Sequence, residues 1–194
     1  VHLTADNRVV IWHDDTLDRA TDGEGSVEEH TLREISALDA GYSFTPDGGR
    51  SYPFRNTGVR IMLLEEALEA LPHMRFNIDL KGRSPALVDE FASIVSHFDA
   101  GERILGASFH THILRALRRK LPMMATSFST REVMRLYLLH RLGVTAGKRH
   151  LTGEVLQIPE YFGRLHVLTD RFIERFHRAG ILIHVWTVNE RSEM

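Results

Sequence analysis

The stretch "LLEEALEALPHMRFNIDLKGRSPALVDEFASIVSHF", residues 63–98, joins two helical patterns through one short strand. Residues 63–74 carry apolar side chains at helical spacing, and residues 75–81 predict a strand. Residues 84–98 predict an amphipathic helix with Ser84 as its N-cap and Pro85 as its first residue. Helix, strand and helix in succession are typical of an α/β protein.

The same alternation continues towards the end of the chain. Further strands are predicted at 103–109, 123–128, 154–159 and 181–188, and further helices at 110–121, 129–142 and 168–180. Ser129 and Glu132 predict a capping box, and Gly180 is expected to close the last helix. Strands separated by helices need crossover connections, so we expect a mainly parallel sheet.

The first third of the chain is different. Two apolar runs, "VHL" at 1–3 and "VVIW" at 9–12, are separated by five residues, too few for a crossover helix. Residues 15–62 show little periodic structure apart from a short helical stretch at 31–38. A segment of this length with so little regular structure is uncommon unless it serves as a lid or binding loop.

Composition restricts the chemistry. The 194 residues are 43% hydrophobic, which suits one well-filled core. A net charge of −2 gives no electrostatic footprint for nucleic acid, so no nucleic-acid partner is expected. The absence of cysteine excludes disulfides, thiolate metal sites and cysteine nucleophiles, which leaves the chemistry to His, Asp and Glu.

The apolar runs are too short to span a membrane, so no transmembrane segment is expected in this sequence. The chain starts at Val1 and stops where a helix could begin, so both ends look cut. Localisation stays open, with the cytoplasm slightly favoured. The oligomeric state also stays open.

Polar side chains gather at the carboxyl ends of the predicted strands. They are His13 and Asp14 after 9–12, Asp79 and Lys81 in 75–81, Gln157 in 154–159, and Trp186 in 181–188. In a parallel barrel or an open α/β sheet, the carboxyl ends of the strands share one face, which holds the active site, so these residues are expected to converge.

Each of these residues also has a structural interpretation. His13 and Asp14 could form a turn that ends the strand. Asp79 in a buried strand needs a partner or a cation, and Lys81 could supply a structural ion pair instead of a metal site. Trp186 could belong to the core. His110 and His112 are expected to be helix-cap or surface residues instead of metal ligands.

The stretch "VHLTADNRVVIWHDDTLDRATDGEG", residues 1–25, resembles the glycerophosphodiester phosphodiesterase family, where D-V-H-L-T-x-D-G-x-x-V-V-x-H-D-x-T-L-x-R-T-T-x-G-x-G is typical. Residues 63–82, "ASFH" at 107–110 and "VWTVN" at 185–189 continue the similarity in order. The resemblance implies a (β/α)₈ TIM barrel that lacks its first strand and most of its second. It also implies one incomplete domain over 1–194, with 15–62 as an inserted substrate-covering loop.

The resemblance further implies hydrolysis of glycerophosphodiesters to sn-glycerol 3-phosphate and an alcohol, with Ca²⁺ or Mg²⁺ as cofactor. In the family, two histidines act as general acid and base, and three acidic residues hold the cation. The residues carried over are His13 as acid or base, Asp14 as the residue that orients it, Asp79 as metal ligand, Lys81 facing the phosphate, Trp186 near the glycerol, and Gln157 as a weaker candidate in the same pocket.

The family's His-Arg-Gly and Glu-x-Asp motifs would precede Val1, so the second histidine and the other metal ligands are expected upstream. We therefore expect these 194 residues alone to be inactive and poorly stable. Two other readings stay open. One is a sphingomyelinase-type phospholipase D on the same barrel, and the other is a degenerate, non-catalytic barrel that acts as a binding module.

Overall fold

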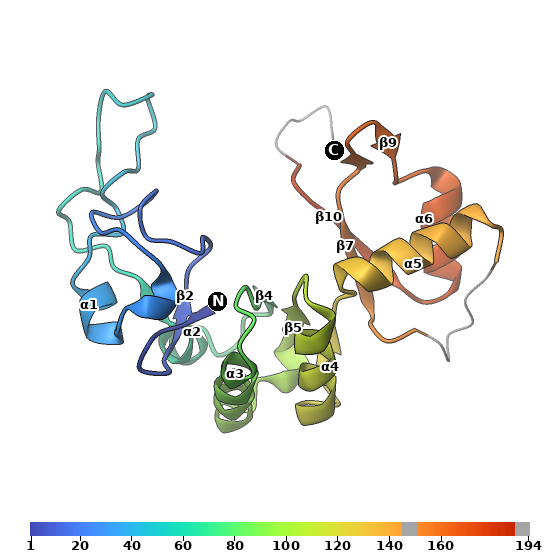
Figure 1. Ribbon diagram of the computed structural model, residues 1–194, viewed down its shortest axis with the longest axis horizontal. Helices are drawn as coiled ribbons and strands as arrows, with labels where there is room; N and C mark the ends of the chain where they lie inside the picture. Colours follow the sequence, from blue (N-terminus) through green and yellow to red (C-terminus); the bar gives the residue numbers. More distant parts are fainter. Residues whose placement is uncertain (145–150, 189–194) are drawn as a thin grey trace. The chain divides into compact units, whose positions relative to one another are not determined.

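A computed structural model describes residues 1–144 and 151–188 (Figure 1). The chain divides into two compact units, residues 1–103 and residues 104–194. Each unit alternates strands and helices, as expected for an α/β protein.

The first unit begins with a small antiparallel sheet of order β1-β2-β3. Its strands are β1 (His2–Leu3), β2 (Val9–Ile11) and β3 (Met62–Leu63). His2 lies opposite Val10 on β2, and Val10 lies opposite Leu63 on β3. The tight return from β1 to β2 passes through Asn7, which has a φ of 57°. The two apolar runs at the start of the chain therefore pair directly with each other.

The segment between β2 and β3 holds one 3₁₀ turn, η1 (Val27–Glu29), and one short helix, α1 (Leu32–Ser36). The predicted short helix at 31–38 is thus confirmed. The segment nevertheless has a core of its own, formed with β2. That core consists of Val10, Leu17, Val27, Ile35 and Ile61, all almost fully buried.

Three elements follow in the predicted order: α2 (Leu64–Ala70), β4 (Phe76–Asp79) and α3 (Pro85–His97). Ser84 caps α3, because its hydroxyl accepts a hydrogen bond from the Ala86 N–H at 3.2 Å. Helix α2 ends earlier than predicted, because Leu71 already leaves helical geometry ahead of Pro72. A 3₁₀ turn, η2 (Gly101–Arg103), closes the unit.

The second unit continues the alternation. Its elements are β5 (Ile104–Ala107), α4 (Thr111–Lys120), β6 (Ala125–Thr126), α5 (Thr130–Arg141), β7 (Val155–Ile158), α6 (Asp170–Arg178) and β10 (Leu182–Val185). Strands β5 and β6 pair in parallel, and so do β7 and β10. The predicted capping box is present, since the Ser129 N–H donates to Glu132 Oε2 at 2.8 Å. Gly180 follows α6 with a φ of 75°.

One antiparallel hairpin in this unit was not predicted. It consists of β8 (Tyr161–Phe162) and β9 (Leu165–His166), and its turn contains Gly163 with a φ of 61°. All four strand residues are exposed, so their side chains do not show the alternating burial by which a strand is recognised.

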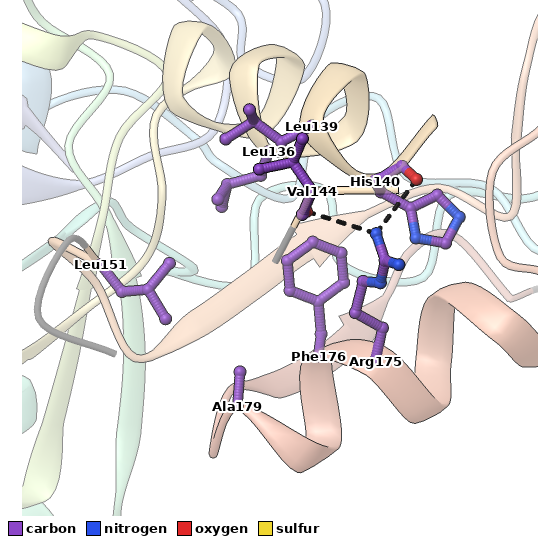
Figure 2. A pocket seen from close by; sticks show the side chains of 8 residues that line it. All are labelled: Leu136, Leu139, His140, Val144, Leu151, Arg175, Phe176 and Ala179. Carbon is purple, nitrogen blue, oxygen red and sulfur yellow. Dashed lines mark hydrogen bonds between the residues drawn. The ribbon is translucent and has the colours of Figure 1, made fainter. Parts of the chain in front are cut away.

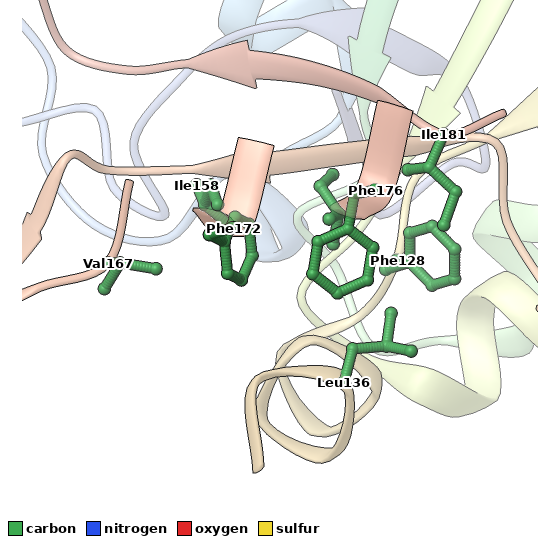
Figure 3. Packing of buried hydrophobic residues seen from close by; sticks show 8 residues of the cluster. Phe128, Leu136, Ile158, Val167, Phe172, Phe176 and Ile181 are labelled. Atoms are coloured by element: carbon green, nitrogen blue, oxygen red, sulfur yellow. The ribbon is translucent and has the colours of Figure 1, made fainter. Parts of the chain in front are cut away.

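The core of the second unit lies between α5, α6 and β7 (Figure 3). The rings of Phe172 and Phe176 on α6 lie 4.5 Å apart, and Leu136 of α5 packs in the same cluster. Its other buried members are Phe128, Leu156, Ile158, Val167 and Ile181. This packing fixes the inner side of α5 against α6.

Within residues 1–144 and 151–188, no helix is both long enough and apolar enough to cross a membrane.

Candidate functional site

Strand β2 leads directly into His13 and Asp14. The His13 side chain is 79% exposed, and its Nδ1 lies 2.7 Å from Asp14 Oδ1. Arg19 donates to both oxygens of the same carboxylate, from Nε to Oδ2 and from Nη2 to Oδ1, the latter at 3.0 Å. These hydrogen bonds, first from Arg19 and then from His13, lower the pKa of Asp14 to about 2. Asp14 is therefore a carboxylate at neutral pH and holds one nitrogen of the imidazole.

Asp79 is the last residue of β4, and Lys81 follows two residues later. Lys81 Nζ lies 2.8 Å from Asp79 Oδ2. The Asp79 side chain is 32% exposed and that of Lys81 is 19% exposed. The ion pair between Asp79 and Lys81, which the sequence suggested as an alternative to a metal site, is present. It stands at an open strand end, where the carboxylate is accessible from solvent.

Strand β1 links these two pairs of residues within the first unit. The Val1 nitrogen donates to the Asp79 carbonyl at 2.6 Å, and the Lys81 N–H donates to the Val1 carbonyl at 3.1 Å. On the other side, His2 Nε2 lies 3.5 Å from the His13 carbonyl oxygen. The start of β1 therefore lies between the end of β2 and the end of β4.

His2 is a further candidate that was not singled out from the sequence. The side chain is almost fully buried, and burial is the main cause that lowers its pKa. A neutral imidazole can donate from Nε2 to the His13 carbonyl, which makes His2 a positioning residue for the end of β2. Its signal in the sequence is a histidine within an otherwise apolar strand.

Asp79 fits a divalent-cation site as a single ligand. A carboxylate oxygen is the ligand that Ca²⁺ and Mg²⁺ prefer. In the part of the chain that the structure describes, there is no group of three or more His, Asp or Glu side chains that could hold a metal ion. His110 is the N-cap residue of α4, and its ring lies 5.7 Å from that of His112.

The second unit carries the remaining candidates. Trp186 follows β10 and is 44% exposed, which argues against a core role. Its ring lies 6.4 Å from that of Phe109, which follows β5. Gln157 lies in β7, opposite His184 of β10. Asn189, the last residue of the "VWTVN" stretch, lies outside the described residues.

A small cavity between α5 and α6 has a different role (Figure 2). Its volume of about 10 Å³ leaves room for one water molecule at most. Arg175 lines it and donates to the carbonyls of His140 and Val144, at 3.1 and 3.4 Å. Arg175 thereby satisfies the carboxyl end of α5, so this hollow is a packing gap and not a substrate site.

Comparison with known sequences gives one consistent answer. A family model described as "Glycerophosphoryl diester phosphodiesterase family" matches residues 1–194. A glycerophosphodiester phosphodiesterase from Caldanaerobacter subterraneus is 28% identical over all of this chain and 74% of its own length. A probable glycerophosphodiester phosphodiesterase 2 from Mycobacterium tuberculosis is 29% identical over all of this chain and 68% of its own length.

Solved structures agree on the fold. A putative glycerophosphoryl diester phosphodiesterase from Silicibacter pomeroyi superposes with a TM-score of 0.74 at 22% identity, over 98% of this chain and 72% of that one. An Oleispira antarctica phosphodiesterase, solved with the product sn-glycerol-3-phosphate, superposes with a TM-score of 0.69 at 22% identity, over 99% and 72%. The predicted TIM-barrel-like α/β fold is confirmed.

Proposed function

Since the chain belongs to the glycerophosphoryl diester phosphodiesterase family, we propose that the intact protein hydrolyses glycerophosphodiesters to sn-glycerol 3-phosphate and an alcohol. The observation that carries the proposal is the pairing of His13 with Asp14 and of Asp79 with Lys81. Both pairs stand at the ends of strands joined through β1, within one unit of a chain that matches the family from end to end.

His13 acts as the general acid or base. Asp14 holds His13 Nδ1 at 2.7 Å, which leaves Nε2 to exchange a proton with the attacking or leaving oxygen. Arg19 holds Asp14 from the other side, so the carboxylate keeps one orientation. His13 as acid or base, oriented by the Asp14 carboxylate, is an arrangement common to acid–base catalysis.

Asp79 serves as a ligand for a divalent cation, Ca²⁺ or Mg²⁺, and the family generally depends on a divalent cation. When bound, such a cation neutralises charge that develops on the phosphoryl oxygens. Lys81 places a second positive charge beside Asp79 and would face the same phosphate. The Lys81 ammonium and a cation held by Asp79 would together attract the anionic diester.

The other assignments concern substrate enclosure. Trp186 offers an exposed aromatic face for the glycerol moiety, and Gln157 is a weaker candidate for a hydrogen bond to it. We assign residues 15–62 as the segment that covers the substrate, and residues 1–194 as one incomplete barrel domain. The small core that anchors residues 15–62 to β2 supports this assignment, because it packs the segment against Val10 and Trp12, which shortly precede His13 in the chain.

The test uses the protein expressed from its complete reading frame. Glycerophosphocholine and glycerophosphoethanolamine are supplied with Ca²⁺ or Mg²⁺, and sn-glycerol 3-phosphate is measured with a coupled dehydrogenase. We expect turnover that EDTA abolishes and the added cation restores. Asp79→Asn and His13→Ala are each expected to lower kcat about 100-fold or more.

Asp99→Asn is the matched control. Asp99 is exposed and follows α3, and asparagine tolerates its φ of 47°. This variant should keep the full activity. Failure to release sn-glycerol 3-phosphate from any glycerophosphodiester would overturn the proposal, and so would full activity in His13→Ala.

A further inference from the structure

The outer side of helix α5, the helix labelled in Figure 1, carries both exposed apolar side chains and arginines, as the sequence and the burial of its residues show. At 3.6 residues per turn, one face of about 120° collects six exposed residues of the helix and its C-cap. They are Arg131, Met134, Arg135, Leu138, Arg141 and Leu142.

The apolar members of this face project into solvent. Met134 is 66% exposed, Leu138 59% and Leu142 66%, and each lies four residues from the next. A surface helix ordinarily has one apolar stripe, which it buries. Here the buried stripe exists as well, because Leu136 and His140 pack towards α6 on the inner side (Figure 2). The outer stripe is therefore a second one, and the fold of this unit leaves it uncovered.

The charge around the outer stripe is positive. The one acidic residue of α5, Glu132, is bound by Arg118 at 2.8 Å. Arg131 and Arg135 form no ion pair with any residue in 1–144 or 151–188. On the neighbouring helix α4, Arg115 and Arg119 line a groove shared with Glu132 of α5.

We propose that this outer face of α5 docks onto the surface of an anionic lipid membrane. The guanidinium groups would bind lipid phosphates, while Met134, Leu138 and Leu142 enter the boundary between headgroups and acyl chains. Anionic lipid headgroups complement the charge of the arginines. The separate apolar side chains need no complementary pocket, because a fluid lipid layer rearranges around them. The inference uses no catalytic residue and holds whether or not the proposed hydrolysis is correct.

A second copy of the chain is a poorer occupant. A two-fold symmetric contact brings the same face of both subunits together. The arginines of one copy would then face the equally arginine-rich surface of the other, and the face carries no acidic residue to compensate them. Like-charge contacts of this kind destabilise an interface.

Co-sedimentation with vesicles tests the proposal. The protein, expressed from its complete reading frame, is mixed with vesicles of phosphatidylcholine alone or of phosphatidylcholine with phosphatidylglycerol. We expect binding to the anionic vesicles that weakens with added salt. Arg131→Gln with Arg135→Gln should lower the partition coefficient about 30-fold, and Met134→Ser with Leu138→Ser should also lower it.

Arg171→Gln with Arg178→Gln is the matched control. It removes the same charge from exposed positions on α6 and should bind like the wild type. Unchanged thermal unfolding shows that each variant is folded. Equal binding by the α5 variants and the wild type overturns the proposal, and so does equal binding to neutral vesicles. Self-association that the Met134 and Leu138 variants abolish would instead assign the face to a second copy.

Discussion

At the scale of single residues, the contact that matters most for the proposed chemistry is the one between His13 and Asp14. We expect Asp14→Asn to lower kcat about tenfold or more with little change in KM. A neutral amide accepts a weaker hydrogen bond from His13 Nδ1 than a carboxylate does, so the imidazole is held less firmly. Steady-state kinetics on glycerophosphocholine measure this. Arg19→Gln should cost less, since it leaves the 2.7 Å contact in place. Wild-type kcat in Asp14→Asn would contradict the orienting role.

The sequence suggested the candidate pairs His13 with Asp14 and Asp79 with Lys81, but it did not suggest the residues that hold these pairs in place. His13, Asp14, Asp79 and Lys81 stand out because polar side chains end apolar strands. Arg19 does not stand out, because it lies in an irregular segment whose turns have no periodic signal. His2 was passed over for a related reason, since its hydrogen bond to the His13 carbonyl depends on how β1 pairs with β2.

At the scale of the elements, Glu132 of α5 connects its own helix to α4 and to the segment that precedes β7. Its carboxylate accepts hydrogen bonds from Arg118, from the Ser129 N–H and from Thr152, each at 2.8 Å. Burial raises the pKa of Glu132, but these hydrogen bonds outweigh it and hold the pKa at about 2. The ionised side chain therefore stabilises the folded state above its ordinary pKa of 4.5, and this contribution is lost as the pH falls towards 2.

Glu132→Gln tests this at two pH values. Near neutral pH we expect the free energy of unfolding to fall by about 1–3 kcal/mol, because the hydrogen bonds to a charged group are lost. At about pH 3 the difference from the wild type should shrink. Chemical denaturation at both pH values measures it. The exposed pair of Glu174 with Arg178 supplies the control, since Glu174→Gln should change stability by about 0.5 kcal/mol or less. An equal cost of Glu132→Gln at both pH values would contradict the linkage.

The helices of both units could be predicted because their apolar spacing and caps agree. Ser84, Ser129 and Gly180 mark the ends of helices where the structure places them. Short strands were harder, since β6 has two residues and its limits depend on pairing with β5. The β8–β9 hairpin escaped because its exposed Tyr161 and Phe162 give no burial pattern.

At the scale of the whole molecule, the decisive question is whether the two compact units fold as one domain. Each has its own buried cluster, one around Leu17 and the other around Phe172. The family has a TIM-barrel-like α/β fold, in which neighbouring βα units pack against and stabilise one another. The single-domain assignment therefore requires that damage to one cluster lower the stability of both units together.

The two tryptophans make this measurable, because Trp12 lies in the first unit and Trp186 in the second. Trp12→Phe and Trp186→Phe variants each leave one fluorescent reporter, so thermal unfolding can be followed separately for each unit. In a single domain, Leu17→Ala should lower the midpoint from both reporters equally, by an amount that corresponds to about 2–5 kcal/mol. Phe172→Ala, in the core of the second unit, should likewise lower the midpoint from both reporters equally. If Leu17→Ala moved the Trp12 transition alone, residues 1–103 would unfold independently, and the assignment of one domain would be wrong.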